Sequence, residues 1–246
     1  GSAGCWLANR LSANPNHRVL LLEAGGRDWH PFIHMPAGIA KMVNRKGINW
    51  DYYTATATGL GNRRLYWPRG KVLGGSSSIN AMCYIRGDAR DYDEWARMAG
   101  DARWNWSGVL PYFKRAEANA RGADALHGAE GLLAVSDLRY RNVLTHAFVD
   151  AAHGAGLPLN PDFNGNGQLG AGFYQVTQKN GARCSTAAGY LRAARGRTNL
   201  TVRTRALTQH VLLDGHRAVG VDYRHHGRLT RAEGREVILC GGAINS

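Results

Sequence analysis

The sequence contains no apolar run that approaches the roughly 18 residues a membrane-spanning helix needs. Its longest apolar runs are short pieces such as Val19 to Leu22. It also has no initiator methionine and no charged-then-apolar leader, so no targeting segment is visible. We therefore expect a cytoplasmic protein, and we leave peripheral association of the whole protein with a membrane open.

Cysteine is scarce and has no motif spacing. The four cysteines are widely separated, with no C-x-x-C pair: Cys5, Cys83, Cys184 and Cys240. This pattern fits neither a disulfide framework nor a zinc site, and it favours free thiols in a reducing compartment. His30 and His34 have the spacing of two metal ligands on one helical face, but Pro31 and Pro36 make a helix improbable there. We predict no metal site.

Acidic residues are few, since 18 Asp and Glu stand against 31 Lys and Arg, which gives a formal net charge of +13. This balance invites a nucleic-acid interpretation. The basic residues are scattered, however, and no DNA- or RNA-binding motif accompanies them. We predict no nucleic-acid partner, but a solvated basic surface or a balance restored by acidic residues outside this sequence.

Two common catalytic motifs, the G-x-S-x-G elbow and the P-loop, are also absent. Asp91, Asp93 and Glu94 cluster on one expected helix. We interpret these three carboxylates as a charged surface and not as an acid/base pair. The sequence therefore offers no catalytic residue from these patterns.

The residues that are present follow helix and strand patterns in an informative order. Small residues open the chain and lead into a helical pattern, and residues 18–26 are typical of a strand covered on both faces, as in parallel α/β sheets. Further helices are predicted over 89–99, 107–118, 142–156 and 185–195, and further strands over 199–204, 206–215, 218–224 and 236–242. In the second of these helices, Ser107 is the expected N-cap and Pro111 lies in the first turn. This order predicts an α/β fold, a Rossmann-like nucleotide-binding domain interrupted by a second domain.

The start of the chain carries the back half of a dinucleotide-binding motif. Gly1-Ser2-Ala3-Gly4 precedes the first helix as the end of G-x-G-x-x-G. Glycine there lets the backbone approach a pyrophosphate, and the helix N-terminus offers N–H groups and a positive dipole. Glu23 lies 19 residues after Gly4 at the end of the apolar strand, close to the roughly 20-residue offset of the acid that holds a ribose.

The stretch "RGKVLGGSSSINAMCYIRG", residues 69–87, is built for close backbone approach. It resembles the first signature of the glucose-methanol-choline (GMC) oxidoreductase family, and "EVILCGGAINS" resembles the start of its second signature. Residues 49–80, 160–191 and 199–208 resemble the choline dehydrogenase branch. The resemblance extends through essentially the whole chain. The alternative interpretation of the serine run is a polar loop held by its own serine-to-backbone hydrogen bonds.

The resemblance implies FAD as the cofactor. Gly1 to Ala3 are expected at the pyrophosphate, Glu23 at the adenosine ribose and Asn80 to Met82 near the isoalloxazine ring. Some members attach FAD through a histidine at the position of Ile79, so the isoleucine here implies a non-covalent flavin. The implied FAD contacts come from Gly1, Ser2, Ala3, Gly4, Glu23, Ala24, Arg69, Val72, Gly74, Gly75, Ser76, Ser77, Asn80, Ala81, Met82, Thr208 (through its backbone) and Ala243.

The resemblance also implies a division of the chain. Residues 1–87 would be the first part of the FAD-binding domain, without its first strand. Residues 88–190 would be part of an α+β substrate or cap domain, and residues 191–246 the returning β-meander and last strand. On this interpretation the sequence is truncated at both ends.

The implied activity is FAD-dependent oxidation of a primary alcohol, choline or an aliphatic alcohol, to the aldehyde, with hydride transfer to flavin N5. In this family a histidine beyond the region matched here acts as the base, so no catalytic residue is assigned to this chain. The expected partners are a small alcohol and an undefined electron acceptor, such as a quinone or a dye. The alternative is a fragment that binds flavin, or only presents a basic surface, without turnover.

Overall fold

The computed structural model describes all residues, Gly1–Ser246, and they divide into two compact units. The first unit consists of Gly1–Ala81 and Ser185–Ser246, and the second of Met82–Cys184. These units follow from contacts alone. The assignment of the predicted ranges to a cofactor and a substrate stays a prediction.

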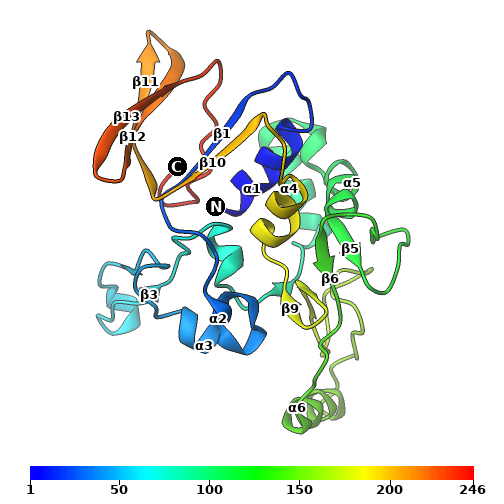
Figure 1. Cartoon of the computed structure of the whole chain (residues 1–246). Coiled ribbons are helices and arrows are strands. Elements are labelled where there is room, and N and C mark those ends of the chain that lie inside the picture. Colours follow the sequence, from blue (N-terminus) through cyan, green and yellow to red (C-terminus); the bar gives the residue numbers. More distant parts are fainter. The chain divides into compact units, whose positions relative to one another are not determined.

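The first unit contains a parallel strand pair, a helix that packs on it and an antiparallel meander (Figure 1). Its regular elements are α1 (Ser2–Leu11), β1 (Val19–Glu23), α2 (Pro31–His34), α3 (Ile39–Met42), β2 (Tyr52–Tyr53), β3 (Tyr66–Trp67), β10 (Leu200–Thr204), β11 (Ala206–Asp214), β12 (Arg217–His225) and β13 (Arg228–Glu233). Short 3₁₀ turns cover Pro36–Gly38, Thr58–Leu60 and Gly75–Ser78, and a π-helical turn covers Ala187–Leu191.

The strand pair β1–β10 and helix α1 form the predicted nucleotide-binding core. β1 pairs in parallel with β10, with Val19 opposite Leu200 and Glu23 opposite Thr204. α1 packs on this pair through its small residues, since a Cβ placed on Gly4 would lie only 3.2 Å from Leu21 Cδ1. Glycine at this position therefore sets the close helix-to-strand distance that the motif predicts.

The meander β11–β12–β13, orange to red in Figure 1, confirms the predicted strands and turns of the C-terminal part. Tight turns at Asp214–Gly215 and His226–Gly227 close the two hairpins, with both glycines at positive φ. The predicted strand over 236–242 is wrong. Residues 236–240 have no regular secondary structure and no strand partner, and an apolar run becomes a strand only where a neighbouring backbone completes its hydrogen bonds.

Two further local expectations for this unit are corrected. A strand does form within residues 18–26, at Val19–Glu23, but it is not covered on both faces, because Leu20 is 38% exposed and β1 has one strand neighbour. Pro31 does not prevent a helix, because it takes the first position of α2, where its missing N–H is not needed. Beside α2, Ile33, Met42, Val72 and Ile79 form a buried apolar cluster.

The second unit is built from short strand pairs and three longer helices (Figure 1). Its elements are β4 (Cys83–Tyr84), α4 (Ala89–Ala99), a 3₁₀ turn (Ala102–Trp104), α5 (Trp106–Ala116), β5 (Glu117–Asn119), β6 (Leu133–Val135), α6 (Val143–Gly154), β7 (Gln175–Val176), β8 (Gln178–Lys179) and β9 (Ala182–Arg183). The pairs are β4–β7, β5–β6 and β8–β9.

Helix ends in the second unit follow capping rules. Asp88 begins α4 with a capping box that Asp91 completes, and the Arg90 guanidinium lowers the pKa of Asp88 to about 2. Ser107 is not the cap of α5. The cap is Asn105, whose side chain accepts a hydrogen bond from the Gly108 N–H at 2.8 Å, and Pro111 lies inside the helix.

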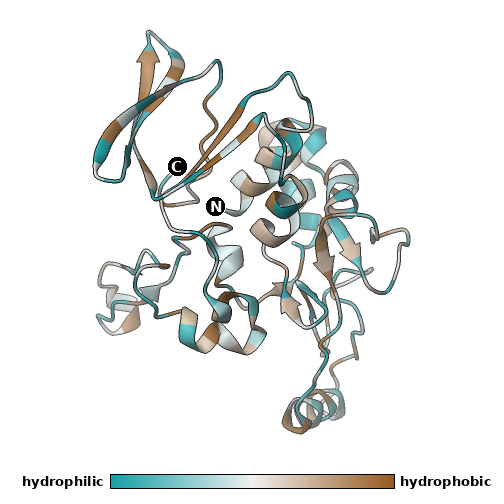
Figure 2. Cartoon of the chain, viewed as in Figure 1, coloured by the Kyte–Doolittle hydropathy of each residue, from teal (hydrophilic) through white to brown (hydrophobic).

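Apolar side chains also lie on the surface of the second unit. In α6 only Val149 is buried, whereas Val143, Leu144 and Phe148 are exposed, and the helix carries brown apolar segments in Figure 2. No helix of the structure combines the length and the apolar composition that crossing a membrane requires.

We expect replacement of Asn105 by alanine to lower the free energy of unfolding by about 1 kcal/mol, because the first turn of α5 loses its cap. Ser107→Ala should have a smaller effect, since its hydroxyl only donates to Asn105 Oδ1. Urea unfolding of both variants measures the difference. A larger loss in the Ser107 variant would mean that the serine, and not Asn105, caps the helix.

Candidate functional site

Three segments that are distant in sequence meet at the N-terminus of α1. They are Gly1–Gly4, the end of β1 at Glu23 and the glycine-serine turn Gly74–Ser78. The Ser2 hydroxyl donates to the Gly74 carbonyl at 3.1 Å and accepts from the Ser77 N–H at 3.3 Å. The structure thus brings together the two motifs that the sequence analysis singled out.

Gly75 is the point of closest backbone approach. Its φ is +57°, a conformation that glycine adopts without strain. A Cβ built on it would lie 2.6 Å from Gly1 Cα, so no side chain fits there. Its neighbour Gly74 also has a positive φ, and its added Cβ would lie 2.4 Å from Ser78 Oγ. Both glycines are therefore required by geometry.

Glu23 lies at the same place and is nearly inaccessible, with 6% of its surface exposed. Its Oε1 accepts the Gly25 N–H at 2.9 Å, and its Oε2 lies 3.2 Å from the Gly1 nitrogen. Gly25 is fixed in turn, because an added Cβ would lie 1.9 Å from the Lys71 carbonyl oxygen. A carboxylate oxygen accepts more than one hydrogen bond, so both oxygens can still accept donors from a ligand.

The serine hydroxyls of the turn form hydrogen bonds with backbone groups of the same stretch. Ser77 Oγ donates to the Gly74 carbonyl at 2.7 Å, and Ser78 Oγ donates to the Leu73 carbonyl at 2.7 Å. Ser76 Oγ accepts the Gly70 N–H at 3.1 Å. The serine-to-backbone bonds that the alternative interpretation expected are thus present, and they hold the turn in shape.

The remaining predicted residues are placed near the site by their neighbours. Val72 is fully buried and forms a bridge with Gly26. Thr208 follows Arg205, whose N–H donates to the Gly25 carbonyl at 2.7 Å. Ala243 follows Cys240, which contacts the positions of Gly1 and Gly4. The chain segments that carry Thr208 and Ala243 thus lie close to Gly25 and Gly1.

Arg69 and Asn80 to Met82 continue the same stretch. The Arg69 guanidinium lies 4.8 Å from the centre of the Trp67 ring. The Asn80 N–H donates to the Ser76 carbonyl at 2.8 Å. Met82 has a φ of +65°, which is uncommon for a residue with a side chain. Its carbonyl accepts the Thr177 N–H at 2.8 Å within the second unit.

The Cys5 thiol, in the helix that begins at the site, is unsuited to nucleophilic chemistry. Cys5 is buried in α1, and burial raises the pKa of its thiol. Since the thiolate is the reactive form of cysteine, the site offers close backbone contacts and a carboxylate, but no activated thiol.

A buried polar network in the second unit is what sequence reasoning missed. Glu117 is fully buried, and its two oxygens accept from Asn119 at 2.7 Å, from Tyr84 at 2.9 Å and from the Arg86 guanidinium. His127 Nδ1 lies 2.8 Å from Glu117 Oε1, and its Nε2 lies 2.8 Å from Asp162 Oδ2. Burial and the Glu117 carboxylate raise the pKa of Tyr84.

No signal in the sequence points to this network. Its members have no motif spacing, since Glu117 lies ten residues from His127 and 31 from Arg86. The histidines that do have ligand spacing have other contacts. His30 Nδ1 accepts the Phe32 N–H at 3.2 Å, and His34 Nε2 lies 2.7 Å from the Asp28 carbonyl oxygen.

Comparison with known proteins assigns the chain. The profile of the GMC oxidoreductase family matches residues 2–246. The chain belongs to the GMC oxidoreductase family. The predicted family and α/β fold class are thereby confirmed, and the glycine contacts described above are those of a GMC chain.

Several relatives are similar over the whole GMC chain. It is 50% identical to an alcohol dehydrogenase (acceptor) of Pseudomonas putida and covers 45% of that protein. It is 46% identical to the mitochondrial choline dehydrogenase of Mus musculus and covers 42% of it. The chain thus spans less than half the length of these relatives.

Solved structures share its fold. Pyridoxine 4-oxidase from Mesorbium loti superposes with a TM-score of 0.95 at 34% identity, over 99% of this chain and 48% of that one. An FAD-dependent oxidoreductase from Chaetomium thermophilum superposes with a TM-score of 0.86 at 27% identity, over 95% and 42%.

The contact at Gly75 can be tested with a matched variant. Gly75→Ala and Gly215→Ala place alanine at nearly the same φ, +57° and +56°, but only the first meets another backbone, because nothing lies within 4 Å of Gly215. We expect the Gly75 variant to have a free energy of unfolding lower by about 1–3 kcal/mol than the Gly215 variant. Equal values in urea unfolding would contradict the close approach.

The network around Glu117 gives a second prediction. Glu117→Gln puts an amide N–H₂ against donors and leaves the buried Arg86 guanidinium without its counter-charge, so we expect a loss of about 3–5 kcal/mol in the free energy of unfolding. Glu94→Gln, which removes the exposed partner of Arg97, should change little. Unfolding curves of the two variants that coincide would show that the network does not stabilise the fold.

Proposed function

We propose that the chain is the FAD-binding portion of an enzyme that oxidises a primary alcohol to the aldehyde. The observation that carries this proposal is the meeting of Gly1–Gly4, Glu23 and Gly74–Ser78 at the N-terminus of α1. A helix N-terminus with glycine backbone around it and a carboxylate at the next strand end suits a dinucleotide. The names of its GMC relatives add the alcohol chemistry.

The residues fit FAD by their shape. No Cβ can be added to Gly75, Gly74 or Gly25 without a contact below 3.0 Å, so bare main chain at these positions is what lets the segments pack together around the N-terminus of α1. α1 has no acidic residue in its first turn, and the positive end of its dipole favours a pyrophosphate there. Glu23 supplies the acceptor that ribose hydroxyls need.

We assign the roles along the dinucleotide as follows. Gly1, Ser2 and Ala3 would offer backbone N–H groups to the pyrophosphate, and Glu23 would accept from the adenosine ribose. The backbone of Thr208 would reach the adenine, and Asn80 to Met82 would lie near the isoalloxazine ring. Ala24, Arg69, Val72, Gly74 to Ser77 and Ala243 would complete the contacts. Ile79 lies in the buried apolar cluster and offers no atom for a covalent flavin link.

FAD, when bound, supplies the acceptor for the hydride that leaves the alcohol carbon. The residues of this chain would bind it and fix its orientation. The turn keeps its shape through hydrogen bonds from the Ser77 and Ser78 hydroxyls to backbone carbonyls, so little reorganisation is needed on binding. The base that accepts the hydroxyl proton is not assigned to any residue of this chain.

The substrate we propose is choline or an aliphatic primary alcohol. The relatives support this class, since their names include an alcohol dehydrogenase (acceptor) and choline dehydrogenases, some of them oxygen-dependent. We leave the electron acceptor and any membrane association undefined. A protein that takes up FAD but oxidises neither choline nor a medium-chain alcohol in a dye-linked assay would contradict the catalytic part of this proposal.

Glu23→Gln should weaken FAD binding by about tenfold or more, because ribose hydroxyls lose a charged acceptor. Glu130→Gln, an exposed carboxylate of the second unit, is the matched control and should leave the affinity unchanged. Flavin fluorescence titration measures both affinities.

Acid precipitation of the protein should release all flavin into the supernatant, since no covalent link is expected. Retention of flavin in the pellet, or equal affinity of the two variants, would contradict these assignments.

A further inference from the structure

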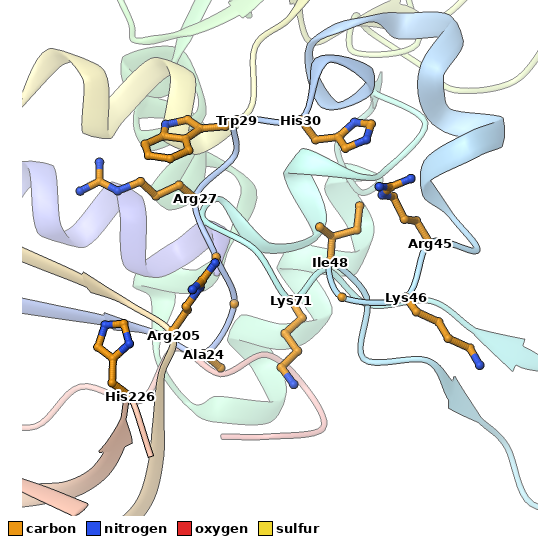
Figure 3. Close-up of a pocket in the computed structure, with 13 residues that line it drawn as sticks. Ala24, Arg27, Trp29, His30, Arg45, Lys46, Ile48, Lys71, Arg205 and His226 are labelled. Atoms are coloured by element: carbon orange, nitrogen blue, oxygen red, sulfur yellow. The ribbon is translucent and has the colours of Figure 1, made fainter. Parts of the chain in front are cut away.

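A cavity of about 640 Å³ lies in the first unit, beyond the end of β1 (Figure 3). Its walls come from five separate parts of the chain, namely residues 24–27 with Trp29 and His30, residues 45–48, Lys71, Arg205 and His226. Only Ala24 belongs to the predicted FAD contacts. The cavity is therefore a feature that the proposed function does not explain.

The charge of this cavity is one-sided. Five of its lining residues carry a fixed positive charge and none is acidic: Arg27, Arg45, Lys46, Lys71 and Arg205. None of these five forms an ion pair with a carboxylate. By contrast, Arg90, Arg97, Arg103, Arg121 and Arg231 each do so elsewhere in the chain.

Cations gathered around one cavity repel each other, and an anion in the cavity relieves that repulsion. Some of them are also held in place. The Lys71 ammonium lies 4.5 Å from the centre of the Trp50 ring, and the Arg27 guanidinium lies 5.5 Å from that of Trp29. The backbone leaves room as well, since a Cβ added to Gly26 or Gly47 would meet nothing within 4 Å.

FAD does not account for this charge. In the proposed arrangement its two phosphate groups lie at the N-terminus of α1, near Gly1. The part of FAD that would lie at Glu23 is the ribose and adenine, which are uncharged. With FAD placed as in the proposed function, its phosphate charge is met near Gly1. The five cations beyond the end of β1 then have no negative charge of FAD to neutralise.

We propose that this cavity is a second anion site, which binds a small molecule bearing two or more phosphate groups. Figure 3 shows Arg45 and Lys46 on one side, Arg27 and Arg205 on the other and Lys71 between them, an arrangement that suits a ligand with several phosphate groups better than a single phosphate. The planar guanidinium forks of three arginines suit phosphate oxygens. The volume is within the range of pockets for small molecules.

The test uses the FAD-loaded protein and sodium tripolyphosphate as the probe. Isothermal titration calorimetry at low salt should show binding that weakens as salt is added. The combined variant Arg27→Gln, Arg45→Gln and Lys46→Gln changes three exposed residues outside the assigned FAD contacts. Its affinity for tripolyphosphate should fall by at least about tenfold, with FAD retained.

The matched control is Arg18→Gln, Arg195→Gln and Arg217→Gln, which removes the same charge from exposed positions that do not line the cavity. It should bind tripolyphosphate as the unchanged protein does. No binding by the unchanged protein, equal weakening in both variants, or displacement of FAD by the probe would overturn the proposal. Binding to phosphatidylglycerol vesicles without binding to tripolyphosphate would overturn it too.

Failure of this proposal is distinguishable from failure of the proposed function. FAD loading is followed separately, by its visible absorbance. A protein that stays colourless contradicts FAD binding whatever the calorimetry shows. A yellow protein that does not bind tripolyphosphate contradicts only the proposed second site.

Discussion

The arrangement of the first unit depends on one steric constraint, the contact between the backbones at Gly1 and Gly75. A single added carbon at Gly75 would lie 2.6 Å from Gly1 Cα, so position 75 must be bare main chain. Once they meet, Ser2 can bond to Gly74 and Ser77, and the turn is fastened to the start of α1. Glu23 is held at the same point through Gly25. A ligand bound there meets N–H groups and a carboxylate on a fixed frame.

Much of this frame could be predicted from the sequence, because its causes are local. Glycines that precede a helix, an acid at the end of an apolar strand and a glycine pair before three serines each constrain their own few residues. The meander follows from turns such as Asp214–Gly215, where a positive φ is required. The meeting of Gly1–Gly4, Glu23 and Gly74–Ser78 in space was predicted from the family resemblance and not from sequence spacing, since no local rule places residue 75 against residue 1.

What could not be predicted depends on partners distant in sequence. Residues 236–242 have the composition of a strand, but a strand also needs a neighbour, and none pairs with them. Asn105 and Ser107 are both good caps, and the choice between them depends on which side chain reaches the Gly108 N–H. Glu117 and His127 look like surface residues by type, and only the fold reveals that both are buried and bonded to each other.

The two units differ in whether their charged side chains have partners of opposite sign, and this difference indicates which unit binds charged ligands. In the second unit the buried Arg86 is paired with Glu117, and His127 lies between Glu117 and Asp162, so each of these polar groups has a partner inside the unit. The buried Arg86 charge is therefore neutralised within the unit, although Arg86 Nε has no hydrogen-bond partner. In the first unit the five cations of the cavity have no carboxylate partners. Charge left uncompensated on a rigid frame favours binding of an ion of opposite sign. The electrostatics therefore favour the first unit as the one that holds charged ligands, and they favour a structural role for the buried charges of the second.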